Sequence, residues 1–176
     1  MDRKMTVTVS YLQMLRRPES LDLTPPREGL TVVRASSPTV PYYRFLYNTV
    51  GEPWLWVDRR KLSDQELASI IQDPAVEIYV LSVDGSPAGF AELDLRKLPD
   101  VEIAYFGIMP GFIGRGLGPY LLRWAIERAW SRTPAPARLW LHTCTLDHPK
   151  ASDTYRRAGF EIYDSRIEIQ DDPRPL

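Results

Sequence analysis

The sequence lacks the cysteines, histidine clusters and long apolar runs on which several classes of protein depend. Cys144 is the only cysteine among 176 residues, so no disulfide can form within the chain. With two histidines, His142 and His148, a single thiol does not form the ligand set of a metal site. No apolar run approaches the roughly 20 residues that a membrane-spanning helix needs. The chain starts with polar alternation in place of an apolar signal core. We therefore expect a soluble cytoplasmic protein without a metal.

An excess of charge of one sign is also lacking. Lys and Arg number 22 and Asp and Glu number 23, which gives a formal net charge of -1. This balance gives no general electrostatic reason to bind nucleic acid or an anionic membrane, and we expect neither as a partner. Hydrophobic residues make up 44% of the chain, which is enough for the packed core of a single domain.

The most informative stretch covers residues 102–122 and predicts a strand, a glycine-rich turn and a helix. The strand is indicated by β-branched and aromatic residues, and apolar residues recur at helical spacing after the turn. Between them stand Gly114, Gly116 and Gly118. Glycines at the start of a helix let backbone N–H groups approach a ligand, and the positive end of the helix dipole favours a phosphate.

The glycine pattern does not match two common phosphate-binding motifs. It is not the dinucleotide-binding motif, because no acidic residue follows about 20 residues later at the end of a second strand. It is not a P-loop, because no Gly-Lys-Ser/Thr closes it. A strand-to-helix turn that binds no ligand remains the alternative.

Residues 113–118 resemble motif A of the GNAT superfamily of acyl-CoA N-acyltransferases, which is written Q/R-x-x-G-x-G/A. Ile113, Gly116 and Gly118 occupy the three defined positions, so the glycines agree and the polar first residue does not. Residues 148–160 resemble motif B of the same family, with His148 in place of its asparagine and Thr154 in place of its leucine. The resemblance extends over about residues 30–169.

The resemblance implies the GNAT α/β fold, a mixed and mostly antiparallel central sheet flanked by helices. We expect one acyltransferase domain over residues 29–176 and an N-terminal extension over residues 1–28. Alternation from Met5 to Tyr11 predicts a strand in this extension, which either lies at an edge of the sheet or contacts a neighbouring subunit of a homodimer.

The remaining elements follow from turn and cap signals, which include a capping box of Ser63 and Glu66 at the start of a helix and a hairpin turn at Asp84 and Gly85. Residues 76–108 predict an antiparallel meander, and residues 138–143 a strand parallel to the one that begins near Glu102. The family implies that these two parallel strands splay apart. A helix is expected to begin at Pro149 with Asp147 or His148 as its cap. Residues 160–163 and 165–169 predict a final hairpin.

The family resemblance implies that the donor is an acyl-CoA, most simply acetyl-CoA, and that the acceptor is an amine of a small molecule or a peptide. Residues expected to bind the cofactor come from the strand, the turn and motif B: Phe106, Gly107, Ile108, Gly114, Arg115, Gly116, Leu117, Gly118, Pro119, His148 and Tyr155. Helix capping is the alternative role for His148.

Two residues are expected to be catalytic. Alkylammonium groups titrate near about 10.4, so a base that deprotonates the amine is useful, and Glu102 is the candidate. Glu92 or Asp94 on the adjacent strand could replace it, and a surface ion pair is the alternative role of Glu102. Motif B implies that Tyr155 is the acid that protonates the leaving thiolate. Packing of Tyr155 against the sheet is the alternative.

The acceptor site is expected among aromatic residues near the first helices. Trp54, Trp56 and Tyr43, together with Glu92, are the candidates, because aromatic faces attract cations. The same rings are equally suited to the core or to a dimer contact. A catalytically silent module that binds acyl-CoA is the alternative function, and a structural domain that binds neither ligand is a third.

Overall fold

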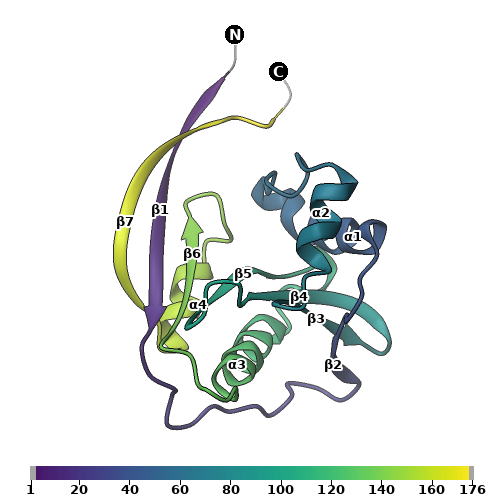
Figure 1. Cartoon of the computed structure of the whole chain (residues 1–176), viewed down its shortest axis with the longest axis vertical. Helices are drawn as coiled ribbons and strands as arrows, with labels where there is room; N and C mark the ends of the chain where they lie inside the picture. Colours follow the sequence, from purple (N-terminus) through teal and green to yellow (C-terminus); the bar gives the residue numbers. More distant parts are fainter. Residues whose placement is uncertain (1–2, 175–176) are drawn as a thin grey trace.

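A computed structural model describes residues 3–174, which form a seven-stranded sheet with helices on both faces (Figure 1). The strand order is β2-β3-β4-β5-β6-β1-β7. The strands are β1 (Lys4–Met14), β2 (Leu30–Arg34), β3 (Val76–Val83), β4 (Ser86–Asp94), β5 (Asp100–Ile108), β6 (Arg138–Cys144) and β7 (Glu161–Asp171). The helices are α1 (Val40–Gly51), α2 (Asp64–Ile71), α3 (Leu117–Trp130) and α4 (Ala151–Arg157), with short 3-10 turns at Glu52–Trp54 and Pro110–Phe112. The mixed, mostly antiparallel α/β architecture expected from the sequence is confirmed.

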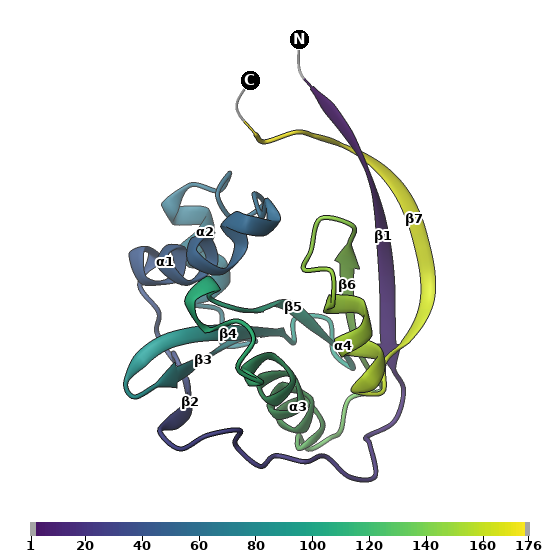
Figure 2. The same cartoon turned by 180° about the vertical axis from the view of Figure 1, so that it is seen from behind.

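Two apolar cores lie on opposite faces of the sheet. Helices α1 and α2 cover one face of β3 and β4, where Tyr43 and Leu46 pack with Phe90. Helix α3 covers the other face, where Leu121 and Leu139 belong to a larger core. The view from behind shows α3 and α4 on the side of the sheet away from α1 and α2 (Figure 2). Each face of the sheet therefore packs against its own apolar core.

Local signals placed several elements correctly. Ser63 and Glu66 form the expected capping box at the start of α2, with bonds in both directions between side chain and backbone. Asp84 and Gly85 turn the chain between β3 and β4 with positive φ angles of 49° and 83°. These turns and caps fix the meander that ends in β5.

The only parallel strand pair among the described residues is short. Strands β5 and β6 pair from Asp100 with Arg138 to Glu102 with Trp140, and no further. The expected splaying of these strands is confirmed. Beyond Glu102, the backbone of residues 103–108 has no strand partner on the β6 side, so its polar groups are available to a ligand.

A β-bulge in β5 decides which way its side chains point. Glu92 pairs with Tyr105 and Leu93 with Ile103, so Ala104 is the extra residue. Simple alternation would place Glu102 and Phe106 on one face. The bulge instead places Glu102 on the α1 side with Tyr105, whereas Phe106 packs on the α3 side.

Strand β1 lies inside the sheet, which corrects the expectation of an edge strand. It pairs with β6 on one side and with β7 on the other, both antiparallel. The expected final hairpin is also wrong, because β7 is a single strand of 11 residues. Its register with β1 shifts so that Tyr163 is an extra residue, and this bulge occupies the place of the expected turn.

Helix α4 begins later than expected, at Ala151 with Lys150 as its N-cap. Asp147 therefore does not cap it. Its carboxylate accepts hydrogen bonds from Thr143 Oγ1 at 2.6 Å and from the Cys144 N–H at 3.0 Å. His148 Nδ1 accepts from the Lys150 N–H at 3.1 Å.

Over residues 3–174, no helix is both long and apolar enough to span a bilayer.

Candidate active site

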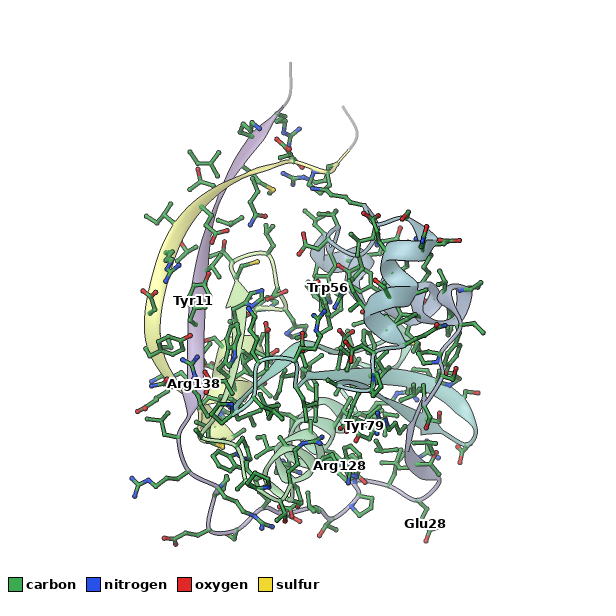
Figure 3. All side chains as sticks on the ribbon, viewed as in Figure 1. Tyr11, Glu28, Trp56, Tyr79, Arg128 and Arg138 are labelled. Atoms are coloured by element: carbon green, nitrogen blue, oxygen red, sulfur yellow. The ribbon has the colours of Figure 1, made fainter. Side chains whose placement is uncertain are left out.

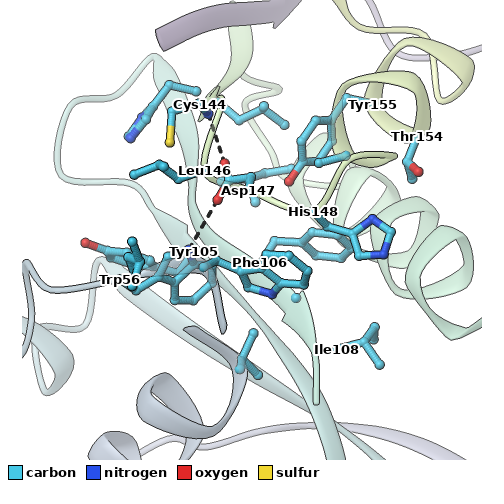
Figure 4. Close-up of a pocket in the computed structure, with 18 of the residues that line it drawn as sticks. Trp56, Tyr105, Phe106, Ile108, Cys144, Leu146, Asp147, His148, Thr154 and Tyr155 are labelled. Carbon is cyan, nitrogen blue, oxygen red and sulfur yellow. Dashed lines mark hydrogen bonds between the residues drawn. The ribbon is translucent and has the colours of Figure 1, made fainter. Parts of the chain in front are cut away.

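A cleft of about 940 Å³ opens where β5 and β6 separate. Its walls come from the loop after α1, the glycine turn before α3, the loop after β6, helix α4, and the paired strands β1 and β7. Figure 4 shows Tyr105 and Phe106 of β5 facing residues of the β6–α4 loop and of α4 across this space. One cavity thus connects both sides of the sheet at the point where the parallel strands diverge.

The glycine turn forms one end of the cleft. Gly114 and Gly116 have φ angles of 84° and 75°, a conformation that L side chains rarely adopt. Gly116 is the N-cap of α3 and makes no side-chain hydrogen bond to the helix start. Within residues 3–174, the N-cap residue therefore supplies no side-chain acceptor to the first N–H groups of α3, and the helix dipole favours an anion here. Lys150 and Arg157 also line the cleft and add positive charge.

Ten of the eleven residues expected to bind the cofactor line this cleft: Phe106, Gly107, Ile108, Gly114, Gly116, Leu117, Gly118, Pro119, His148 and Tyr155. Arg115 does not. Its guanidinium lies over the Phe112 ring, 5.3 Å from the centroid. Its charge therefore lies against the face of an aromatic residue that itself lines the cleft.

Tyr155 projects from α4 into the cleft wall, with 8% of its surface exposed. Its ring meets Phe106 edge to face, with 6.1 Å between centroids. Burial raises the pKa of the Tyr155 hydroxyl well above its usual range, and the charge of Asp147 raises it further. The hydroxyl is therefore protonated at neutral pH, which is the state that a proton donor requires.

Glu102, the expected base, does not line the large cleft. It borders a smaller cavity of about 370 Å³ with Trp140. The residue between Glu102 and the cleft is His142, whose Nδ1 lies 3.6 Å from Glu102 Oε1. Interaction with Glu102 raises the pKa of the His142 imidazole, against the opposing effect of burial. Glu102 can therefore influence the cleft through the protonation of His142.

Glu92 and Tyr43 are not accessible to an acceptor. Both are 0% exposed and neither lines the cleft, because Tyr43 of α1 packs onto the face of the sheet that carries Glu92. The Tyr43 hydroxyl donates to Glu92 Oε2 at 2.5 Å. The expectation that these two residues contact substrate is therefore wrong. The same burial removes Glu92 as an alternative base.

Trp54 and Trp56 do line the cleft, as expected for acceptor-site residues. Trp56 Nε1 donates to Asp147 Oδ1 at 3.4 Å, a contact that joins the loop after α1 to the loop after β6 (Figure 4). The Trp54 ring meets His148 edge to face at 5.2 Å. These contacts link the loop after α1 to the loop after β6 on the opposite wall of the cleft.

Sequence reasoning missed Asp147 and His142. Asp147 accepts bonds from Thr143, Cys144 and Trp56, so it fixes the end of β6 and the facing wall together. Strand alternation could have indicated His142, because it places Trp140 and His142 on the same face of β6. We found no group of three metal-binding side chains in the part of the chain that the structure describes.

Comparison with known proteins decides the family. The model of the acetyltransferase (GNAT) family matches residues 43–160. The chain belongs to the GNAT family. Its relatives include an uncharacterised N-acetyltransferase of Methanocaldococcus jannaschii, 33% identical over 89 residues, covering 47% of this chain and 38% of that protein. Streptothricin acetyltransferase of Streptomyces lavendulae is 31% identical over 105 residues, 56% of this chain and 51% of that protein.

Solved structures share the GNAT fold at low sequence identity. A functionally unknown conserved protein from Staphylococcus epidermidis matches with a TM-score of 0.67 and 18% identity, over 94% of this chain and 62% of that one. A GCN5-related N-acetyltransferase from Kribbella flavida matches with a TM-score of 0.61 and 20% identity, over 96% and 59%. The chain thus spans only part of the length of these relatives.

Proposed function

We propose that this GNAT protein transfers an acetyl group from acetyl-CoA to a primary amine, by direct attack of the amine in a ternary complex. The observation that carries the proposal is the meeting of three features in one cleft. These are the unpaired backbone of β5, the uncapped start of α3 and the buried hydroxyl of Tyr155.

The residues at the glycine end suit the phosphates of acetyl-CoA. The N–H groups at the start of α3, with Lys150 and Arg157, would hold those phosphates. The free backbone of residues 106–108 would hold the pantetheine arm as an added strand holds a sheet edge. Bound there, acetyl-CoA supplies the thioester carbonyl that the amine attacks.

Two groups of the chain handle the protons. An alkylammonium acceptor titrates near about 10.4, so it must lose a proton before it attacks. His142 would accept this proton directly or through a water, and Glu102 would stabilise the imidazolium that forms. Tyr155 would donate its proton to the departing thiolate. Base and acid therefore stand on different elements that line one cleft.

A catalytically silent acyl-CoA-binding module remains the second candidate. It would share the glycine turn and the splayed strands but would need neither His142 nor Tyr155. The raised pKa of His142 beside Glu102 favours the enzyme, because a purely binding module gains nothing from a charged pair at the junction of the cleft.

The experiment has two stages. Calorimetric titration with acetyl-CoA tests the donor site, and failure to bind would remove both candidates. A transfer screen across amine classes, read as released thiol, then tests the enzyme. Streptothricin belongs in that screen because the name of the Streptomyces relative points to it. Tight acetyl-CoA binding without transfer to any amine class would favour the silent module.

A further inference from the structure

A buried polar cluster lies behind the acceptor side of the cleft and outside it. Glu92 of β4 is 0% exposed and accepts from two donors. The Tyr43 hydroxyl donates to Oε2 at 2.5 Å, and Arg59 Nη2 donates to Oε1 at 2.7 Å. Arg59 is itself only 9% exposed. None of these three residues lines the cleft.

A cluster of this kind is weak evidence for stability alone. Removing two charges from water costs free energy that their attraction offsets only when geometry is good, and apolar replacements of similar size are often as stable. Arg59 Nε is also buried without a hydrogen-bond partner in the part of the chain that is described. We therefore look for a role of the cluster in positioning Arg59.

Arg59 is the sole buried residue of the segment 52–62, which connects α1 to the start of α2. The same segment supplies Trp54, Trp56 and Asp58 to the cleft. Trp56 and Leu62 of this segment are half-buried and pack against the core, but the one fully buried attachment of the segment is the charged contact of Arg59 with Glu92. Removing the partner of Arg59 should release the segment without opening the apolar core beneath it.

Arg59 also contacts the two tyrosines at the back of the cleft. Its guanidinium lies 5.2 Å from the centroid of the Tyr105 ring, and its backbone N–H donates to the Tyr47 hydroxyl at 3.3 Å. Both tyrosines line the cleft. Arg59 thus connects the sheet and Tyr105 through its side chain, and Tyr47 through its backbone.

We propose that Glu92 and Tyr43 are positioning residues that fix the acceptor-side segment 52–62 through Arg59. Only the assignment of segment 52–62 to the acceptor side rests on the proposed function. The side-chain hydrogen bonds of Glu92 reach neither the glycine turn, nor residues 106–108 of β5, nor α4, so we expect the glycine end of the cleft to keep its shape when the cluster is changed.

The test is hydrogen–deuterium exchange of the whole chain, resolved by peptide, on Glu92→Gln. Glutamine keeps the shape and removes the charge. We expect exchange in residues 52–62 to become at least about tenfold faster, with little change in the glycine turn. Acetyl-CoA affinity, measured by calorimetry, should stay within about twofold of the unmodified protein. Unchanged exchange in residues 52–62 would overturn the proposal.

The matched control is Glu77→Gln on the neighbouring strand β3. Glu77 is also buried and bonded to Arg132 and to the Tyr79 hydroxyl, on the other face of the sheet. Figure 3 shows Tyr79 and Arg128 on the side of the sheet away from Trp56. We expect this variant to lose stability without faster exchange in residues 52–62. Equal loosening of that segment in both variants would show a general structural effect and contradict the proposal.

A triple variant guards against a fold that Glu92→Gln damages. Tyr43→Phe, Glu92→Met and Arg59→Met together replace the whole cluster with apolar groups, so no unpaired charge remains. We expect a midpoint of thermal unfolding near that of the unmodified protein and still faster exchange in residues 52–62. Exchange restored to the original rate would mean that apolar contacts position the segment equally well, and the proposal would fail. If the unmodified protein does not bind acetyl-CoA, the proposed function is refuted. The exchange result for residues 52–62 would still stand.

Discussion

The imidazole of His142 and the carboxylate of Glu102 face each other across the two parallel strands, with 3.6 Å between Nδ1 and Oε1. Glu102 is the last residue of β5 that pairs with β6. His142 lies two residues beyond Trp140, its partner in β6. The pair therefore stands where the strands begin to separate. The charge of Glu102 acts directly on the protonation of His142, which lines the cleft.

Replacing Glu102 by glutamine should move the pH dependence of transfer toward acid. Glu102 raises the pKa of His142, so the unmodified protein needs a higher pH to hold the imidazole in its neutral, basic form. Without that charge, the pKa falls, and the rise in kcat/KM should begin at lower pH with a lower plateau. The measurement is a pH profile of kcat/KM. Asp94→Asn, a carboxylate on the same small cavity, should leave the profile unchanged. A profile of Glu102→Gln that matches the original would mean that the pair does not carry the proton.

Replacing His142 by asparagine should remove this rise altogether. A positioned base contributes on the order of 10² in rate, so we expect turnover to fall by about that factor near neutral pH. Acetyl-CoA affinity should not change, because the cofactor end of the cleft is built by other elements. A variant that keeps full turnover when chemistry limits the rate would show that the amine arrives already neutral and that positioning dominates.

Replacing Tyr155 by phenylalanine should lower turnover with little effect on acetyl-CoA affinity. The ring contact with Phe106 is kept and only the hydroxyl is lost. A proton donor acts on the departing thiolate, so its loss is felt in kcat more than in binding. Turnover is measured by released thiol and affinity by calorimetry. Unaffected turnover under rate-limiting chemistry would assign Tyr155 to packing alone.

Replacing Gly116 by valine should weaken acetyl-CoA binding by at least about tenfold while the chain stays folded, because a β-branched residue is strained at positive φ. The matched control is Gly111→Val, at a nearby exposed position with open space around it and outside the cleft. Calorimetry gives the affinities, and circular dichroism the folded state. Equal affinities in the two variants would argue against the turn as the phosphate site.

Local chemistry made much of this fold predictable. The capping box at Ser63, the turn at Asp84 and the glycines before α3 are set by neighbours in sequence, and each lies where its pattern indicated. The family motifs pointed to segments that line the cleft for the same reason, since a turn and a helix start are contiguous segments.

The errors arose where distant segments decide the outcome. Strand β1 shows the right alternation, but nothing in it reveals that β6 and β7 will pair on both sides. Tyr43 and Glu92 were assigned to the acceptor site because the packing of α1 over β4 is invisible in the sequence. Simple alternation also fails to give the face of Glu102, because a single extra residue, Ala104, shifts the alternation of β5.

The position of β1 brings the two ends of the described chain together. Lys4 pairs with Asp171, and the Asp172 N–H donates to the Arg3 carbonyl at 2.8 Å (Figures 1 and 2). A short turn from Arg174 to Arg3 would therefore convert β7 and β1 into an ordinary hairpin. The exposed connector of residues 15–29 could then be cut to provide new ends. We expect such a circular permutant to fold with the same sheet order and to bind acetyl-CoA with unchanged affinity, because the cut alters none of the pairings of the sheet. The order of the strands along the chain and their order in the sheet are thus separable in this protein, and its first strand is first only in the sequence.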